Sequence, residues 1–540
     1  MIGIEHMASA GSLSIGIDVG GTNTDAVVLD ESNCVLVATK QSTTDDVTDG
    51  IRAALAAVLD ELGMGRQRVS RVMMGTTHAT NAIVGRRGLG RVAVVRLGAP
   101  ATTGFPPLTG WPSDLRAETL AGAAILSGGH MVDGTPIGAV DAGAIRRFLN
   151  GLDGPIDAVA ICGVFSPSFP EQEREVEDIV RSHLGDSVPI SLSHEIGAIG
   201  MVERENATVL NASLNGVAKN VSHGLMTVVQ EEGLGGASVF FAQNDGTLMA
   251  LEFAVRFPVL TIGSGPANSI RGAALLSGVD NAIVVDVGGT TSDLGVIVGG
   301  FPRESTMPRE IGGVRTNFRM PDIVSIGVGG GTLVNIDEGT IGPGSVGHRL
   351  QQEALLFGGD CATLTDAAVH AGVAGESFDG RALPDLSSRV ENSLESGLEM
   401  AHGRLAEAVE RLSHGKIDQP LVVVGGGGVL VAEDLPGVVT ILHPDHGGVA
   451  NAVGAAVSLV GGRAQRISGY EDREQVLESA SHDAIERAIE AGADPLHVQI
   501  IDVVETPVSY SAEQSIRVSV KAAGPLARLG ATATQPAAPY

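Results

Sequence analysis

The chain has 540 residues, of which 43% are hydrophobic, and it carries a formal net charge of −28. This length is too great for one compact core and suits two large lobes with a smaller unit. Because so acidic a surface repels nucleic-acid phosphates and anionic lipid headgroups, the charge argues against nucleic-acid and membrane partners.

The three cysteines, Cys34, Cys162 and Cys361, lie far apart in the sequence. Their odd number and spacing exclude a disulfide framework and a redox activator with a bridging iron–sulfur cluster. No apolar run reaches the roughly 20 residues that span a bilayer. Residues 1–14 lack the basic and then apolar regions of a signal peptide. We therefore expect a cytoplasmic protein.

The first predicted element, residues 13–30, is a strand, a tight glycine turn and a second strand, because apolar runs flank Gly20-Gly21-Thr22-Asn23. Apolar spacing then predicts a helix over 49–62. An α/β alternation follows, with strands expected at 69–74, 92–97 and 158–164 and helices from Ala79, from Pro170 and over 202–221.

The second half repeats the opening hairpin at residues 281–298. Asp18 and the turn after it match Asp286 and its turn, and Asp25 matches Asp293. Such a long repeat, about half a chain away, indicates an ancestral duplication. A helix over 391–412 and a strand over 420–424 then lead to Gly425-Gly426-Gly427-Gly428.

These elements predict an α/β protein made of two duplicated lobes and a small C-terminal unit. We expect the lobes at 13–195 and 196–465. A small αβ domain follows over 466–530, because the pattern there changes to one helix and two strands. Residues 531–540 are rich in Ala, Thr and Pro, and we expect them to be disordered.

Both hairpins suit the phosphates of a nucleotide. Exposed backbone N–H groups and a threonine hydroxyl bind phosphate oxygens, and glycine lets the phosphates approach. Asp18 and Asp286 end the incoming strands and are the expected Mg²⁺ ligands, directly or through water. The expected phosphate-binding residues are Gly20, Gly21, Thr22, Asn23, Gly288, Gly289, Thr290 and Thr291. The turn at Gly425, Gly426 and Gly427 would let a purine lie against the backbone, so ATP and Mg²⁺ are the predicted cofactors.

Thr76, Thr77 and Asn81 form a polar turn before a predicted helix. Either these side chains cap the helix, or they contact the γ-phosphate and the group that it activates. His78 beside them is either a proton shuttle or a solvated side chain. Weaker candidates, more readily explained as solvated charges or turns, are Glu195, Glu203, Asp322, Asp366 and the His443–Asp445–His446 cluster.

Two phosphate hairpins followed by an adenosine loop resemble the actin, sugar-kinase and heat-shock-chaperone ATPase superfamily. Within it, the chain resembles the hydantoinase/oxoprolinase family, specifically its N-methylhydantoinase A-type subunit, over residues 13–460. The most specific string is Gly-Thr-Thr-x-Ala-Thr-Asn-Ala at 75–82. Further matching segments are 16–30, 193–214, 264–273, 284–297, 322–332 and 363–372.

The resemblance implies an actin-like fold and ATP-dependent opening of a cyclic amide such as a hydantoin or 5-oxoproline. It implies Asp18, Asp286, Thr76, Thr77 and Asn81 as catalytic residues, an oligomer, and a second B-type subunit as a possible partner. The family often has histidine where this chain has Val324, and its C-terminal portion is usually longer. Both departures put the identity of the substrate in question.

Two other functions use the same hairpins. A kinase or carboxylase subunit would form a different product from ATP, so product analysis separates it from a hydrolase. A reactivating chaperone would use ATP to remodel a partner enzyme, and the string at 75–82 disfavours this alternative, because such chaperones are not expected to carry it.

Overall fold

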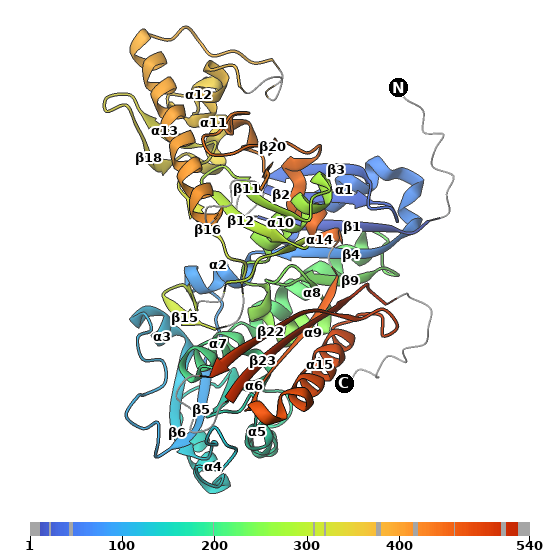
Figure 1. Cartoon of the computed structure of the whole chain (residues 1–540), viewed down its shortest axis with the longest axis vertical. Coiled ribbons are helices and arrows are strands. Elements are labelled where there is room, and N and C mark those ends of the chain that lie inside the picture. The colour runs from blue at the N-terminus through green and yellow to red at the C-terminus, as the bar shows by residue number, and fades with distance from the viewer. Residues whose placement is uncertain are drawn as a thin grey trace.

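The computed structural model describes residues 11–20, 23–42, 47–197, 199–305, 308–317, 320–373, 378, 380–413, 419–457, 459–508 and 515–527. Three larger sheets organise the chain (Figure 1). Among these residues, no helix is long and apolar enough to cross a membrane.

The first sheet has nine strands in the order β22-β23-β21-β10-β9-β4-β1-β2-β3. Its N-terminal strands are β1 (Leu13–Val19), β2 (Asn23–Leu29), β3 (Val35–Ser42), β4 (Val69–Thr76) and β9 (Ser238–Ala242). β1 is antiparallel to β2, which is antiparallel to β3. β1 is parallel to β4, which is parallel to β9. Helix α1 (Val47–Leu62) packs its buried Ile51, Leu55, Val58 and Leu59 into the core of this sheet.

The second sheet repeats this arrangement. Its strands, in order, are β13 (Phe301–Pro302), β12 (Ser292–Val298), β11 (Asn281–Val287), β19 (Leu421–Val424) and β20 (Ile441–Leu442), and β16 (Val324–Ile326) also pairs with β12. β11 is antiparallel to β12 and parallel to β19, which is parallel to β20. Even the register agrees, because Asp18 lies opposite Asp25 and Asp286 lies opposite Asp293. The predicted α/β class and the duplication are therefore confirmed.

The third sheet is parallel, in the order β6-β5-β7-β8, and lies at the end of the molecule opposite α13 (Ser388–Ser413) (Figure 1). Its strands are β5 (Val92–Ala99), β6 (Leu120–Ser127), β7 (Ala158–Gly163) and β8 (Ile190–Leu192). Helices α4 (Ala142–Asn150) and α5 (Glu171–Leu184) share one apolar core with it, and α7 (Met201–Ser213) shares another. The predicted helix over 202–221 is two helices, α7 and α8 (Asn215–Glu231), on either side of Leu214.

Helices α10 (Ser264–Ser277) and α14 (Ala450–Val457) pack against each other where the first two sheets meet (Figure 1). Glycines make their contact possible. A Cβ on Gly454 would stand 1.8 Å from the carbonyl oxygen of Asn268, and one on Gly272 would stand 1.9 Å from that of Ala450. No side chain fits at such distances, so the backbones of the two helices touch directly.

The C-terminal elements extend the first sheet. β21 (Val460–Gly469) is parallel to β10 (Leu248–Ala250), and β23 (Ser515–Gly524) joins it to β22 (Gln499–Val508). Helix α15 (Arg473–Glu490) packs on β21 and β23 through Ala480, Ala484 and Ala488. The helix and two strands expected after residue 465 are present, whereas the domain boundaries stay predictions and residues 531–540 lie outside the described residues.

Shorter elements complete the chain. The helices are α2 (His78–Gly85), α3 (Ser113–Thr119), α6 (Ser193–Ile196), α9 (Leu251–Arg256), α11 (Leu350–Glu353) and α12 (Leu364–His370). The strands are β14 (Arg309–Ile311), β15 (Val314–Thr316), β17 (Thr332–Asn335) and β18 (Thr340–Ser345).

Candidate nucleotide and reaction site

Asp18 near the end of β1 is buried and is held by two amides from different helices. Nδ2 of Asn268, on α10, lies 3.3 Å from Oδ1 of Asp18, and Nδ2 of Asn451, on α14, lies 3.2 Å from Oδ2. Burial, followed by the nearby charge of Asp25, raises the pKa of Asp18 to about 6. The charge of Asp286 adds to this increase, so the two hairpin carboxylates lie within electrostatic reach of each other.

Asp286 has the corresponding position near the end of β11. The hydroxyl of Ser269 donates a hydrogen bond to its Oδ2, and burial raises the pKa of Asp286 to about 6. Ser269 directly follows Asn268, so adjacent residues of α10 hold the two carboxylates. One short helical segment therefore fixes the ends of both hairpin strands.

Asp25 and Asp293, which lie opposite Asp18 and Asp286 in the two hairpins, have different partners. Nζ of Lys40 lies 2.6 and 2.7 Å from the two carboxylate oxygens of Asp25. Asp293 accepts a hydrogen bond from the hydroxyl of Ser325. Burial raises the pKa of both carboxyl groups. The lysine therefore offsets the charge of Asp25, whereas the charge of Asp293 acts on Asp286 and raises its pKa further.

The two glycine turns have the same hydrogen bond. Gly20 N–H donates to the carbonyl oxygen of Asn23 at 3.0 Å, and Gly288 N–H donates to that of Thr291 at 2.9 Å. In the second turn, the N–H groups of Gly330 and Gly331 donate to the carbonyls of Gly288 and Gly289 at 3.0 and 2.7 Å. Gly289 and Thr290 lie in this turn as expected, whereas Gly21 and Thr22 fall outside the described residues.

The predicted adenosine loop lies against the second hairpin. Gly427 N–H donates to the carbonyl oxygen of Val287 at 2.7 Å. Gly425 has a φ of 87°, and a Cβ there would stand 2.2 Å from Oδ1 of Asp286. Gly426 faces open space, with no atom within 4 Å of a Cβ placed on it. The backbone of the loop therefore lies against the Asp286 carboxylate.

Thr77 begins α2 without capping it. No side-chain cap bond forms at this position; instead, its hydroxyl donates to the carbonyl oxygen of Val19 at 3.2 Å. Nδ2 of Asn81 lies 3.3 Å from the same hydroxyl. Thr77 and Asn81 therefore connect the start of α2 to the end of β1, next to the first glycine turn.

Thr76 is buried and faces the other lobe and His78. Its backbone N–H and C=O both lie within hydrogen-bonding distance of the Ser264 hydroxyl, at 3.4 and 3.2 Å. Its hydroxyl is hydrogen-bonded to Nδ1 of His78. Burial lowers the pKa of His78, which favours the neutral imidazole near neutral pH. His78 is thus partly buried and bonded rather than freely solvated.

The arrangement fits a divalent cation bound with a nucleotide. Asp18 is buried and Asp286 half-buried, and the hydrogen-bond donors to these two carboxylates are two amides and a hydroxyl. Oδ1 of Asn268, beside Asp18, is buried and has no hydrogen-bond partner in the structure. A hard cation prefers such oxygen ligands and would offset the cost of burying the two charges.

The weaker sequence candidates have structural partners. Asp322 forms ion pairs with Arg303 and Arg309 at 3.0 and 2.7 Å, and Glu195 pairs with Arg256 at 2.5 Å. Asp366 completes a capping box at the start of α12. Glu203 lies 3.9 Å from Arg315. Over the described ranges, no three His, Cys, Asp or Glu residues are grouped to hold a metal, so the cluster at 443–446 is not one.

Sequence reasoning missed the residues that hold the carboxylates. Asn268, Ser269 and Asn451 are buried or half-buried polar residues on α10 and α14. The sequence of segment 264–273 could have indicated that Asn268 and Ser269 have a role, because this polar pair interrupts a run of small residues. Nothing in the sequence around Asn451 indicates that its partner is Asp18, because only the packing of α14 against β1 brings the two together.

Comparison with known families and structures identifies the class of the protein. Residues 14–184 match the hydantoinase/oxoprolinase N-terminal region, and residues 204–463 match the hydantoinase/oxoprolinase family. The chain therefore belongs to the hydantoinase/oxoprolinase family.

Individual relatives have different activities. The chain is 29% identical over 390 residues to caprolactamase subunit alpha of Pseudomonas jessenii, covering 65% of this chain and 53% of that one. It is 27% identical over 422 residues to the acetophenone carboxylase gamma subunit of Aromatoleum aromaticum, covering 71% and 56%. The matches thus span about half the length of these curated relatives.

The fold agrees with a solved relative. The crystal structure of the ATP-dependent caprolactamase from Pseudomonas jessenii has a TM-score of 0.74 and 21% identity, covering 95% of this chain and 88% of that chain. With the duplicated sheets, this likeness confirms the predicted fold class, a two-lobed α/β fold of the actin-like ATPase type.

Proposed function

We propose that this chain binds ATP and Mg²⁺ between its two glycine hairpins and uses them to hydrolyse a small cyclic amide. The observation that carries the proposal is the pair of carboxylates, the buried Asp18 and the half-buried Asp286, held by adjacent residues of α10 at equivalent strand ends. Two such carboxylates without a cation would be costly to bury. Asp18 and Asp286 would hold Mg²⁺, and the turns at Gly20 and Gly288 would hold phosphates.

Bound ATP would supply a phosphoryl group to the oxygen of the cyclic amide, which makes the amide carbon reactive toward water. The chain's contribution is to orient the groups and to stabilise charge. Thr77 and Asn81 lie at the start of a helix that is bonded to the first hairpin, so their polar groups are close to the phosphate turn. His78, kept neutral by burial, would accept or donate a proton through its ring.

A carboxylase-type subunit is the second candidate, because the acetophenone carboxylase gamma subunit matches over a larger share of this chain than caprolactamase subunit alpha. The same phosphate site would then activate a different acceptor. Since both relatives are named as subunits, we also propose that this chain works with a second polypeptide in an oligomer. The protein to test is therefore the assembly that co-purifies from the native host.

The experiment incubates this assembly with ATP, Mg²⁺ and a panel of lactams and hydantoins, and measures both ADP and the ring-opened product. We expect one ring compound to increase ADP release and to yield its ring-opened acid in an amount equal to the ADP: an amino acid from a lactam, or an N-carbamoyl amino acid from a hydantoin. ADP release that requires bicarbonate and a ketone, with no ring opened, would favour the carboxylase candidate. An assembly that uses ATP to remodel a partner enzyme, and converts no other small molecule, would contradict both the hydrolase and the carboxylase candidates.

A further inference from the structure

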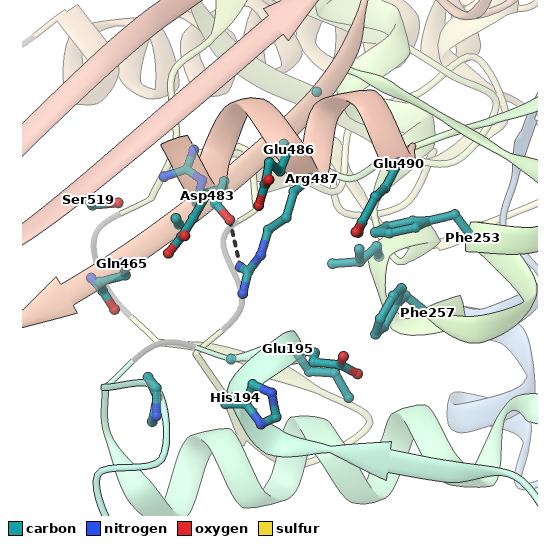
Figure 2. A pocket seen from close by; sticks show the side chains of 18 of the residues that line it. His194, Glu195, Phe253, Phe257, Gln465, Asp483, Glu486, Arg487, Glu490 and Ser519 are labelled. Carbon is teal, nitrogen blue, oxygen red and sulfur yellow. Dashed lines mark hydrogen bonds between the residues drawn. The ribbon is translucent and has the colours of Figure 1, made fainter. Parts of the chain in front are cut away.

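A second site lies apart from the two hairpins. A cavity of about 380 Å³ opens between α15, β21, α9 and the turn after β9 (Figure 2). Neither Asp18, Asp286 nor Thr77 lines it. Because β4 and β9 are parallel neighbours, Asn244 follows β9 at the same edge of the sheet where Thr77 follows β4. The cavity thus shares an edge of the sheet with the candidate reaction site.

Buried hydrogen-bond donors without partners line this cavity. Asn244 is 3% exposed, and its Nδ2 has no hydrogen-bond partner in the described structure. Arg463 binds Glu304 through Nη2, but its Nη1 is likewise buried and unpartnered. A buried donor that makes no hydrogen bond is destabilising, and such groups in a cavity are usually completed by a ligand or water.

Arg487 adds a positive charge. Figure 2 shows its side chain extending from α15 into the cavity. Nη1 of Arg487 donates to the carbonyl oxygen of Arg463 at 2.6 Å, and no carboxylate of the described chain lies within 4.0 Å of its guanidinium. The neighbouring Arg466, in contrast, lies 2.6 Å from Asp483. Burial lowers the pKa of Arg487, although the charges of Asp483, Glu195 and Glu490 act in the opposite direction.

The opposite wall combines two aromatic rings with the ion pair of Arg256 and Glu195. Phe253 and Phe257 pack with ring centroids 4.6 Å apart, and Leu260 lies beside them. Figure 2 shows both rings across from Arg487, with Glu490 above them. A ligand here would place an anionic end among the donors and an apolar body against the rings.

We propose that this cavity binds a short carboxylic acid, with its carboxylate held by Arg487, Arg463 and Asn244 and its alkyl chain against Phe253 and Phe257. Guanidinium groups match carboxylates in shape and charge, which favours a carboxylate over an amine. Opening a cyclic amide yields a carboxylate, so the ring-opened product would fit. Only that identification rests on the proposed function.

The test titrates the full chain, without nucleotide, with pentanoate, pentylamine and inorganic phosphate, using calorimetry or ligand-observed NMR. We expect saturable binding of pentanoate, little binding of phosphate and none of pentylamine. Arg487→Gln and Asn244→Leu should each weaken pentanoate binding about tenfold or more. Arg66→Gln removes the same charge at a site outside the cavity and should leave binding unchanged.

Several results would overturn the proposal: no pentanoate binding, binding of pentylamine or phosphate as tight as that of pentanoate, or pentanoate binding unchanged in a folded Arg487→Gln variant. If this variant does not fold, Arg487→Lys serves in its place, because the charge is kept but the planar fork is lost; it should weaken binding, and unchanged binding would count against the site. Because the titration contains no ATP, a negative result would contradict the carboxylate site without bearing on the proposed nucleotide chemistry.

Discussion

The side-chain amide of Asn451 lies 3.2 Å from Oδ2 of Asp18, although 433 residues separate the two in the chain. The contact joins the first strand of the protein to α14, the helix that precedes the C-terminal strands. Together with Asn268 on α10, it fixes the carboxylate at the junction of the two lobes. A hydrogen bond to the charged form lowers the pKa of a carboxyl group, so Asn451 partly offsets the effect of burial on Asp18.

Asn451→Leu should therefore raise the pKa of Asp18 above about 6. Because only the ionised carboxylate holds Mg²⁺ well, Mg²⁺-dependent ATP binding should be lost at a higher pH than in the wild type. Calorimetric titration with ATP and Mg²⁺ between pH 5 and pH 8 measures the midpoint, which is the pH at which half of the binding is lost. The control, Asn281→Leu, changes an exposed asparagine at the start of β11 and should leave the midpoint in place. An unmoved midpoint in Asn451→Leu would show that this contact does not act on the site.

Gly454→Ala should disturb the same junction. The new Cβ would stand 1.8 Å from the Asn268 carbonyl oxygen, so α10 and α14 must separate. We expect a destabilisation of about 3 kcal/mol or more, with weaker ATP binding. Gly403→Ala on α13 is the matched control, because nothing lies within 4 Å of its Cβ. That change should stabilise the chain by about 0.5–1 kcal/mol. Thermal unfolding measures the change in stability of each variant, and equal changes in the two variants would contradict the prediction.

The raised pKa of Asp286 makes folding depend on pH. Between its ordinary value of 3.8 and about 6, the folded chain binds more protons at Asp286 than the unfolded chain does. Without Mg²⁺ and nucleotide, this group therefore destabilises the fold increasingly as the pH rises through that window. The full effect is on the order of 3 kcal/mol.

Asp286→Asn should consequently be more stable than the wild type at pH 7.5, and the gain should disappear near pH 4. Denaturant unfolding at several pH values measures it. Asp60→Asn changes a carboxylate whose side chain is 84% exposed and should alter stability little at any pH. If Asp286→Asn were less stable than the wild type at pH 7.5, the hydrogen bond from Ser269 would outweigh the cost of burying the charge, which would contradict this prediction.

Thr77→Val tests the reaction site. Because the Thr77 hydroxyl bonds Val19 and Asn81 rather than capping α2, the variant should keep its fold and ATP binding. Turnover should fall by roughly 10²-fold, the scale of one lost transition-state donor. Thr363→Val removes a hydroxyl that does cap a helix and should cost about 1 kcal/mol of stability at unchanged turnover. Substrate-stimulated ATPase and melting temperature, measured on both variants, separate the roles; a destabilised but fully active Thr77→Val would mean that Thr77 is structural.

The sequence predicted those features that depend on local pattern. Repeated apolar runs around glycine placed both hairpins, and the matched Asp18 and Asp286 indicated a duplication that the sheet order and register confirm. The start of α2 followed from the polar turn after β4. What could not be predicted depends on packing between distant segments. The hydroxyl of Thr77 could equally have capped its helix, and its bond to Val19 exists only because β1 and β4 are neighbours.

The most direct test of the central claim is calorimetric titration of ATP into the wild type and Asp286→Ala, each with and without Mg²⁺. If Asp18 and Asp286 hold the metal between two phosphate-binding hairpins, the wild type should bind ATP tightly only with Mg²⁺. Asp286→Ala should bind weakly or independently of the metal. Unchanged, Mg²⁺-dependent binding of ATP by Asp286→Ala would contradict the claim.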